Sequence, residues 1–290
     1  VVLGAINAFD MPGRQSLLIQ MTSKDDLLSA ISLNSAVFNA ARSVGPGVAG
    51  LLVAWLGEGV CFLLNGVSFL AVIGSLLAMR LAPFNRKAAA SPWSHLVDGF
   101  RYARHHSDVR RVLTVMAAAT FANMPVLVLA PVFADQIFHR GSRGLGFLLA
   151  AMGVGAVIGT LGLARRAQSL NLQPIIAYSG MVMGAATIAF ALSPSYALSV
   201  VIMPLIGYSV FRQMASANTT IQTLILDEYR GRIMSMYSMT IVGLGPFGSL
   251  AAGALAGRFG APATTVLGGA LAIASAAVFG LANRRRSVAI

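Results

Sequence analysis

Long apolar runs recur along the whole chain, and they constrain its fold more than any other feature. A helix needs about 20 mostly apolar residues to cross the hydrocarbon core of a bilayer. The sequence therefore predicts an all-α, polytopic helical membrane protein. A partial run covers 1–20, and eight fuller runs lie at 31–56, 59–80, 111–134, 145–164, 173–193, 196–222, 233–257 and 263–283.

The composition agrees with this reading. Of the 290 residues, 57% are hydrophobic and only 10% are charged, and the mean hydropathy is +0.76. Soluble domains carry about 25% charged residues, so a water-soluble globule of this size could not cover its apolar surface. The one cysteine, Cys61, cannot form an internal disulfide, and the four histidines lack metal-ligand spacing. We therefore expect no metal and no cofactor.

The net charge of +12 comes from 21 Lys and Arg against 9 Asp and Glu. When loops are assigned alternately to the two sides of the membrane, the cations gather on one side, which the positive-inside rule makes cytoplasmic. This assignment places the C-terminus in the cytoplasm and accounts for the charge without nucleic acid. The cytoplasmic set has sixteen members, Arg14, Lys24, Arg80, Arg86, Lys87, Arg101, Arg104, Arg110, Arg111, Arg165, Arg166, Arg230, Arg232 and Arg284–Arg286, against Arg140, Arg143 and Arg258 outside.

One connection is much longer than the others. Residues 81–110 contain Pro83 and an Ala-Ser-Pro run, followed by apolar residues at helical spacing. This pattern predicts a cytoplasmic linker that ends in an amphipathic helix at the membrane face. The linker divides the chain into part of a first bundle (1–80), the linker itself (81–110) and a second bundle (111–290). The apolar positions of the amphipathic helix are Leu96, Val97, Phe100, Tyr102 and Ala103.

A loose repeat with a period of about 200 residues runs through the sequence. An acidic pair, Asp25–Asp26, precedes a span that contains Gly45–Pro46. The same order recurs at Asp227–Glu228 and Gly245–Pro246. Such a period is typical of transporters built from two parallel halves, here of six spans each.

These motifs resemble those of major facilitator exporters, in the branch of enterobactin exporters, macrolide efflux pumps and transmembrane secretion effectors. The matching stretches are DMPGR at 10–14, KDDLLSAI at 24–31, ARSVGPGVAG at 41–50, LVDGFRYAR at 96–104, QTLILDEYRGR at 222–232 and GPFGS at 245–249. The resemblance implies two six-helix halves, of which spans four to twelve are present, so that the sequence is an N-terminally truncated fragment. It also implies alternating access, proton coupling and a location in the bacterial cytoplasmic (inner) membrane.

The stretch at 41–50 resembles the antiporter motif of the fifth span, with Gly45, Pro46 and Gly50 in place. Pro46 cannot donate to the carbonyl of Arg42, so the helix should bend there. The glycines allow a second backbone to approach closely. Either they provide tight packing alone, or they form a seal between the bundles that favours export. The expected partner surface consists of Gly153, Gly155, Gly159 and Gly162.

Two arginines, Arg42 and Arg212, lie inside predicted spans. A central membrane arginine costs about 2.5–3.5 kcal/mol on insertion scales, so it should face a partner or a wet cavity. The alternative is a side chain that reaches the membrane surface from a helix end. A sparse polar cavity would suit an amphiphilic or weakly anionic cargo. The predicted substrate residues are Asn39, Arg42, Asn123, Arg212, Gln213 and Asn218.

A second group of charges lies near the predicted cytoplasmic ends of the spans. Asp10 and Arg14, and likewise Glu228 and Arg232, are four residues apart and can pair on one helical face. They form either an inner gate or a set of solvated loop charges. The predicted gate residues are Asp10, Arg14, Asp227, Glu228, Arg230 and Arg232.

The sequence thus predicts a secondary active transporter that exports a small amphiphilic molecule of the drug, macrolide or siderophore type, with roles in antibiotic resistance or siderophore export. Its expected partners are membrane lipid, the small-molecule cargo and protons, and it is expected to be a monomer. An importer of the same fold, or a non-transporting membrane sensor or assembly factor, are the alternatives. An enzyme is disfavoured because the spans contain no paired acids with a histidine.

Overall fold

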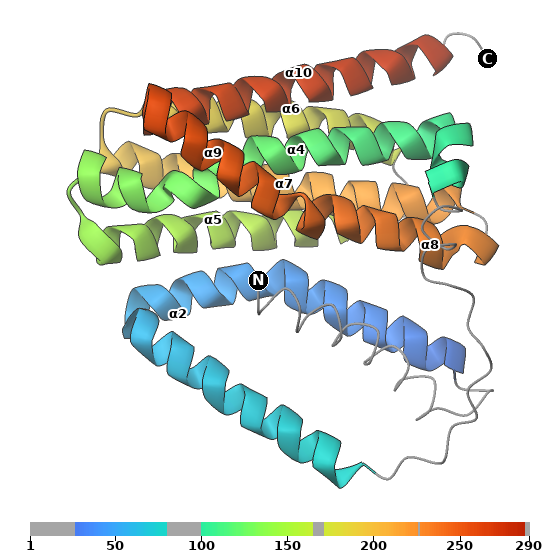
Figure 1. Ribbon diagram of the computed structural model, residues 1–290, viewed down its shortest axis with the longest axis horizontal. Helices are drawn as coiled ribbons and strands as arrows, with labels where there is room; N and C mark the ends of the chain where they lie inside the picture. The colour runs from blue at the N-terminus through green and yellow to red at the C-terminus, as the bar shows by residue number, and fades with distance from the viewer. Residues whose placement is uncertain (1–26, 80–99, 165–170, 226, 288–290) are drawn as a thin grey trace.

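The computed structural model describes residues 27–79, 100–164, 171–225 and 227–287 (Figure 1). In these ranges the regular structure is helical, and seven segments are long and apolar enough to cross a membrane. The predicted all-α polytopic fold is therefore confirmed. The partial span predicted at 1–20 lies outside the described residues.

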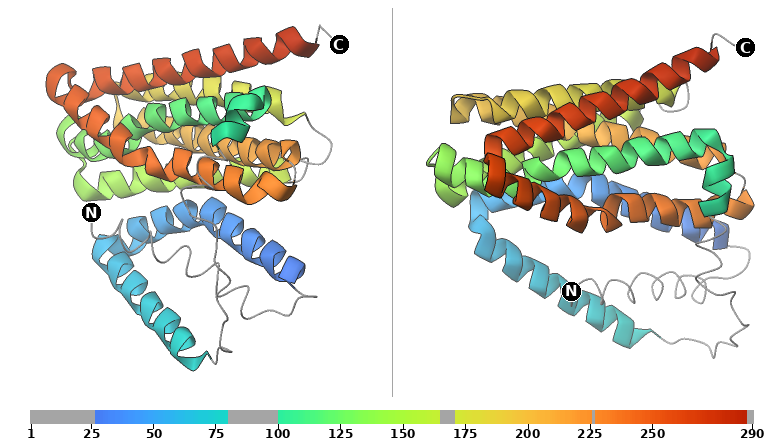
Figure 2. Two further views of the ribbon diagram at one scale, coloured as in Figure 1. Left: turned by 45° about the vertical axis from the view of Figure 1, so that its right-hand side comes forward. Right: turned by 45° about the horizontal axis from the view of Figure 1, so that its top comes forward.

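Helix α2 (Leu27–Ala78) bends sharply at Gly57, where φ is 78° and ψ is 165°. This left-handed conformation is accessible to glycine at little steric cost. The bend separates two arms that correspond to the spans predicted at 31–56 and 59–80. The first arm lies along α5 (Gly141–Ala164), and the second diverges from the bundle (Figures 1 and 2). None of the described residues of the second arm is buried.

The remaining helices pack into one bundle of six spanning segments (Figure 2). All six predicted spans from residue 111 onward are confirmed, with their ends shifted by a few residues. Two segments contain a π-helical turn, which follows Pro131 in the first and precedes Pro246 in the fifth. The elements are α4 (Ser107–Val132) with η1 (Phe133–Ile137), α5, α6 (Leu172–Ala191), α7 (Tyr196–Leu224), α8 (Asp227–Ser238) with η2 (Met239–Gly243) and α9 (Gly245–Phe259), and α10 (Ala261–Ser287).

Glycines set the distance between several of these helices. A Cβ added at Gly155 of α5 would lie 1.8 Å from the carbonyl oxygen of Pro204 on α7, and one added at Gly207 would lie 1.9 Å from that of Met152. Helices α5 and α7 therefore touch backbone to backbone. Such close approach is the usual basis of helix association in lipid, where apolar burial alone gives little driving force.

These contacts correct part of the prediction for the glycines of α5. Helix α2 does pack along α5. Gly155 and Gly159, however, face Pro204 and Tyr208 of α7, and Gly162 is exposed, with no atom of the described residues within 4 Å of an added Cβ. Gly155, Gly159 and Gly162 follow an i, i+4, i+7 spacing and share one face of α5, which is turned towards α7, while Gly153 points to the opposite side. Gly155 and Gly159 therefore serve the contact between α5 and α7.

The predicted amphipathic helix is described over residues 100–105, while Leu96 and Val97 lie outside the described residues. Its apolar residues do not share one environment. Tyr102 and Ala103 are buried against the bundle, whereas Phe100 is 64% exposed. The helix is thus anchored on one side by Tyr102 and presents Phe100 on the other.

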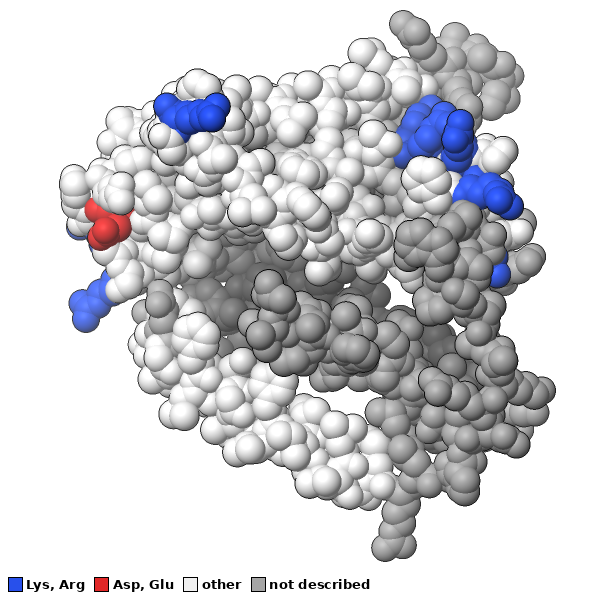
Figure 3. All heavy atoms as spheres, in the orientation of Figure 1, with Lys and Arg blue, Asp and Glu red and all other residues white. Residues whose placement is uncertain are grey.

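Charged side chains gather at the two ends of the bundle, with uncharged surface between them (Figure 3). Arg101, Arg104, Arg110 and Arg111 lie at or before the start of α4, an end that we call the Ser107 end. Because consecutive spans are antiparallel, the start of α5 and the end of α9 lie at the opposite end. That end carries Arg140, Arg143 and Arg258.

The α5–α7 contact gives a direct test of the packing. Gly155→Ala places a methyl group against the backbone of Pro204 and should destabilise the protein by about 1–3 kcal/mol, the usual cost of overpacking. The matched control is Gly162→Ala on the same helix, which should be neutral or slightly stabilising because alanine favours helix over glycine. Thermal unfolding of the purified variants measures both. Equal midpoints for the two variants would contradict the described contact.

Candidate functional site

One face of α7 carries a row of buried polar side chains. Ser209, Gln213, Ser216 and Thr220 recur at intervals of three or four residues, and each is at most 5% exposed. The amide nitrogen of Gln213 donates to the carbonyl of Ile176 on α6 at 3.3 Å. This row lies in the α6–α7 interface, which places the predicted residue Gln213 between two helices of the bundle. Ser209 and Thr220 were missed by the sequence reasoning, although their helical spacing was a signal for them.

Glycine makes room for this polar contact. A Cβ added at Gly180 of α6 would lie 2.6 Å from Nε2 of Gln213 and 2.8 Å from the Cβ of Ala276 on α10. Three helices therefore meet at Gly180. The Gln213 side chain fills the space that a larger residue at this position would occupy.

Arg212 lies beside Gln213, in the middle third of α7. It is twelve residues from Leu224, the nearer helix end, which is about 18 Å at 1.5 Å per residue. Its Nη1 donates to the hydroxyl of Tyr208, one turn earlier, and its Cζ is 5.3 Å from the centre of that ring. Its Nε is buried and has no hydrogen-bond partner among the described residues. The Tyr208 contact keeps the guanidinium away from both helix ends.

Two predicted asparagines have different surroundings. Asn123 of α4 is 8% exposed, and its Oδ1 is buried without a hydrogen-bond partner in the described part of the chain. Asn218 of α7 is half-buried and accepts a hydrogen bond from Nε2 of Gln222, one turn later. Asn123 therefore keeps an unsatisfied acceptor inside the bundle, a costly arrangement unless another group supplies a donor.

For the predicted residues on α2, the structure describes the backbone but not the side chains. Asn39, Arg42, Gly45, Pro46 and Gly50 all belong to the first, helical arm of α2, which lies along α5. Their side chains lie outside the described residues. The helix continues through Pro46, and the sharp bend in α2 is at Gly57.

At the Ser107 end, aromatic rings and one arginine form a stacked column. The ring of His106 stacks on Tyr102 with centroids 3.7 Å apart, and Tyr102 stacks on Tyr229 of α8 at 4.5 Å. The Cζ of the predicted gate residue Arg232 lies 5.5 Å from the Tyr229 ring centre. The column joins helix 100–105, the start of α4 and α8. Sequence reasoning did not find it, because its members come from two separate connections.

The structure describes less of the other predicted gate residues. Asp10 and Arg14 lie outside the described residues, as do the side chains of Asp227, Glu228 and Arg230. Asp227 begins α8, so this segment follows the end of α7 directly. A contact between the acidic residues of the predicted gate and the column stays a prediction.

The fold defined by these helices is that of a major facilitator transporter. A solved structure with the same fold is a bacterial homologue of the human lysosomal transporter Spinster, in an inward-facing and unoccupied conformation. The TM-score is 0.53 at 14% identity, and the match covers 93% of this chain and 72% of that one. The chain belongs to the transmembrane secretion effector family, whose profile matches residues 1–288.

Characterised relatives agree with this assignment. The chain is 28% identical over 276 residues to the multidrug efflux pump Tap of Mycolicibacterium fortuitum, covering 91% of this chain and 66% of that protein. It is 24% identical to the staphyloferrin A transporter of Staphylococcus aureus, covering 97% of this chain and 70% of that protein. It is 27% identical to the enterobactin exporter EntS of Shigella flexneri, covering 90% and 60%.

The chain thus spans about two thirds of the length of these relatives. Family and relatives together indicate a multi-pass membrane transporter, and not an enzyme. The resemblance found in the sequence motifs is confirmed at this level.

Proposed function

We propose that this protein is a secondary active exporter of a small amphiphilic molecule, of the drug, macrolide or siderophore type, that works by alternating access. The observation that carries the proposal is the family match over residues 1–288, with a multidrug efflux pump and an enterobactin exporter among the relatives. An importer of the same fold and a non-transporting sensor or assembly factor are the alternatives that transport measurements distinguish.

The proposed organisation has part of a first bundle at 1–80, a linker at 81–110 and a second bundle at 111–290. The mutual packing of six spanning segments between Ser107 and Ser287 supports this division. The first arm of α2 lies against α5, on the outside of those six. We propose that the Gly45, Pro46 and Gly50 motif on this arm seals the two bundles against each other.

For the substrate path we propose the set of Asn39, Arg42, Asn123, Arg212, Gln213 and Asn218. Arg212 supports the proposal most strongly, because a mid-membrane guanidinium is costly without a function and its buried Nε has no hydrogen-bond partner among the described residues. The unsatisfied Oδ1 of Asn123 adds a second polar group. Gln213 acts by holding α7 to α6, which positions its neighbour Arg212. A cation in this position favours a weakly anionic cargo.

For the inner gate we propose Asp10, Arg14, Asp227, Glu228, Arg230 and Arg232. The stacked column supports the location, because it ties Arg232 and Tyr229 to Tyr102 in the connection before α4. Opening and closing at this end would have to change the contact between α8 and helix 100–105. We further propose protons as the coupling ion and a monomer as the transporting unit.

Arginine distribution supports an orientation with the Ser107 end and the C-terminus in the cytoplasm of a bacterium, and the opposite end outside the inner membrane. Single cysteines at exposed positions test it, in a background where Cys61 is replaced by alanine. A cysteine at Arg140 should react with a membrane-impermeant maleimide in intact cells, and one at Arg104 should react only after lysis. Labelling of both positions in intact cells would contradict the orientation.

Removing the charge of Arg212 tests the substrate path. Arg212→Ala, in the intact protein expressed in cells that lack their own pumps, should lower the export of a weakly anionic amphiphile by about 10- to 100-fold, because a charged hydrogen bond contributes about 1.5–3 kcal/mol. Arg212→Lys should keep part of the activity, since the charge remains but the planar fork is lost. The rate of efflux from preloaded cells is the measurement.

The matched control is Arg258→Ala, which removes an exposed arginine at the opposite end of the bundle. This variant should export at the rate of the unmodified protein. Arg212→Ala variants that accumulate normally in the membrane and also export normally would show that Arg212 takes no part in the path.

A further inference from the structure

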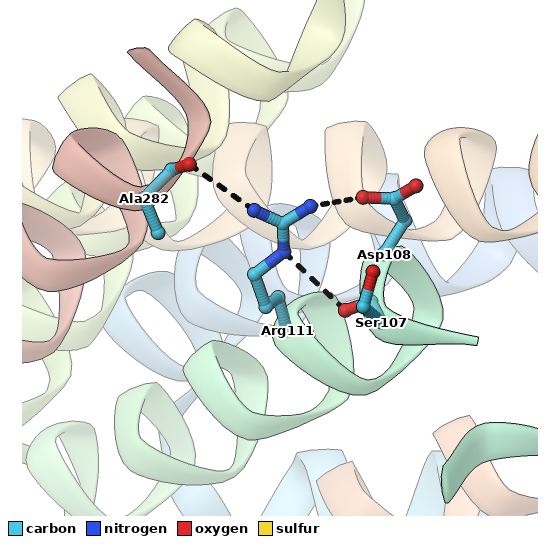
Figure 4. Close-up of polar contacts among 4 residues, drawn as sticks. All are labelled: Ser107, Asp108, Arg111 and Ala282. Carbon is cyan, nitrogen blue, oxygen red and sulfur yellow. Dashed lines mark hydrogen bonds and ion pairs between the residues drawn. The ribbon is translucent and has the colours of Figure 1, made fainter. Parts of the chain in front are cut away.

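Two basic segments that are far apart in the sequence meet at the Ser107 end. The guanidinium of Arg111 donates from Nη1 to the carbonyl oxygen of Ala282 on α10 at 3.2 Å, and from Nε to that of Ser107 at 3.3 Å (Figure 4). Its Nη2 pairs with Asp108. Ala282 is two residues before Arg284–Arg286, and α10 continues through these residues to Ser287. The start of α4 is thus joined to the part of α10 that carries three arginines.

Three more arginines lie on the α4 side of this junction. Arg101, Arg104 and Arg110 are all exposed, and Nη1 of Arg110 donates to the carbonyl of Arg104 at 3.0 Å. That bond holds the guanidinium of Arg110 next to helix 100–105. Asp108 is the only acid among residues 100–111, and it is paired with Arg111. The junction therefore has an excess of positive charge.

An exposed apolar stripe on α10 ends at the same junction between α4 and α10. Leu267, Leu271, Val278 and Leu281 are between 44% and 68% exposed, and their spacing places them on one face of the helix. The stripe ends at Leu281, directly before the carbonyl that Arg111 binds. Phe100 adds a second exposed apolar group, beside Arg101.

We propose that this junction is a binding site for an anionic phospholipid, and name it the α4–α10 lipid site. The exposed stripe of α10 accommodates an acyl chain. Arg101, Arg104 and Arg110 face the headgroup, where arginine forms charge-assisted hydrogen bonds to phosphate. A zwitterionic lipid binds less well, because its own amine balances the phosphate charge. The bound lipid stabilises the junction between α4 and α10, whatever the cargo of the protein is.

The test is lipid-dependent thermal stability of the purified intact protein, titrated in detergent with phosphatidylglycerol or with phosphatidylcholine of the same chain length. Phosphatidylglycerol should raise the unfolding midpoint by several degrees in a saturable way, and phosphatidylcholine should not. The triple variant Arg101→Gln, Arg104→Gln, Arg110→Gln should lose most of this shift. The apparent lipid affinity should fall about fivefold for each arginine removed.

Matched variants distinguish the effect of removing these three charges from a general effect of substitution on folding. The double variant Arg140→Gln, Arg143→Gln, at the opposite end of the bundle, should keep the full shift, and replacement of the three arginines by lysine should keep most of it. If the triple glutamine variant does not fold, the single variants Arg101→Gln and Arg104→Gln provide the same comparison.

Several results would overturn the proposal. These are equal shifts with the two lipids, an equal loss of the shift in the Arg140–Arg143 double variant, or unchanged lipid affinity in the single variants. Inorganic phosphate tested at the concentration of the lipid separates a lipid site from a simple anion site. A shift of the same size with inorganic phosphate would also overturn the proposal.

Discussion

Close backbone contact between helices is the interaction on which the rest of this structure depends. In lipid the main-chain polar groups must bond within each helix, and apolar side chains gain little by leaving one apolar medium for another. The helices must therefore fit together through shape. Gly155 and Gly207 bring α5 and α7 into contact, and Gly184 would clash with the carbonyl of Gly269 if it carried a Cβ, so α6 and α10 are equally close. The six-segment bundle follows from these contacts.

The same tight packing isolates the polar groups that the bundle contains. Gln213 satisfies its amide nitrogen on α6 across the space that Gly180 leaves. Among the described residues, the guanidinium of Arg212 contacts the hydroxyl and the ring of a tyrosine on its own helix, and Oδ1 of Asn123 accepts no hydrogen bond. Buried polar groups in soluble cores are nearly always paired. In the part of the chain that the structure describes, incomplete pairing is not confined to the proposed substrate path. It also affects buried polar atoms of five other described side chains, those of Ser179, Ser199, Ser209, Ser216 and Asn283.

Most of the fold could be predicted from the sequence, because the length and composition of a membrane span are physical requirements that appear directly in the residues. The break between the spans at 31–56 and 59–80 falls at Gly57, where the structure has its bend. The rotation of each helix was harder to predict: the spacing places Gly155, Gly159 and Gly162 on one face of α5, but the sequence did not reveal that this face is turned towards α7. For the candidate site, the polar character of α7 was predicted, but not that Gln213 faces α6. The His106–Tyr102–Tyr229 stack depends on two connections meeting in space, which no local pattern records.

The central claim is that the protein moves an amphiphilic molecule outward at the expense of a proton gradient. Everted membrane vesicles that contain the intact protein test this claim most directly, because export then appears as uptake into the vesicle. We expect respiration to drive accumulation of an amphiphilic weak acid or dye, and a protonophore to abolish it. The absence of proton-dependent flux for every amphiphile in a panel of drugs and siderophores, or a net flux out of the everted vesicles, would contradict the account.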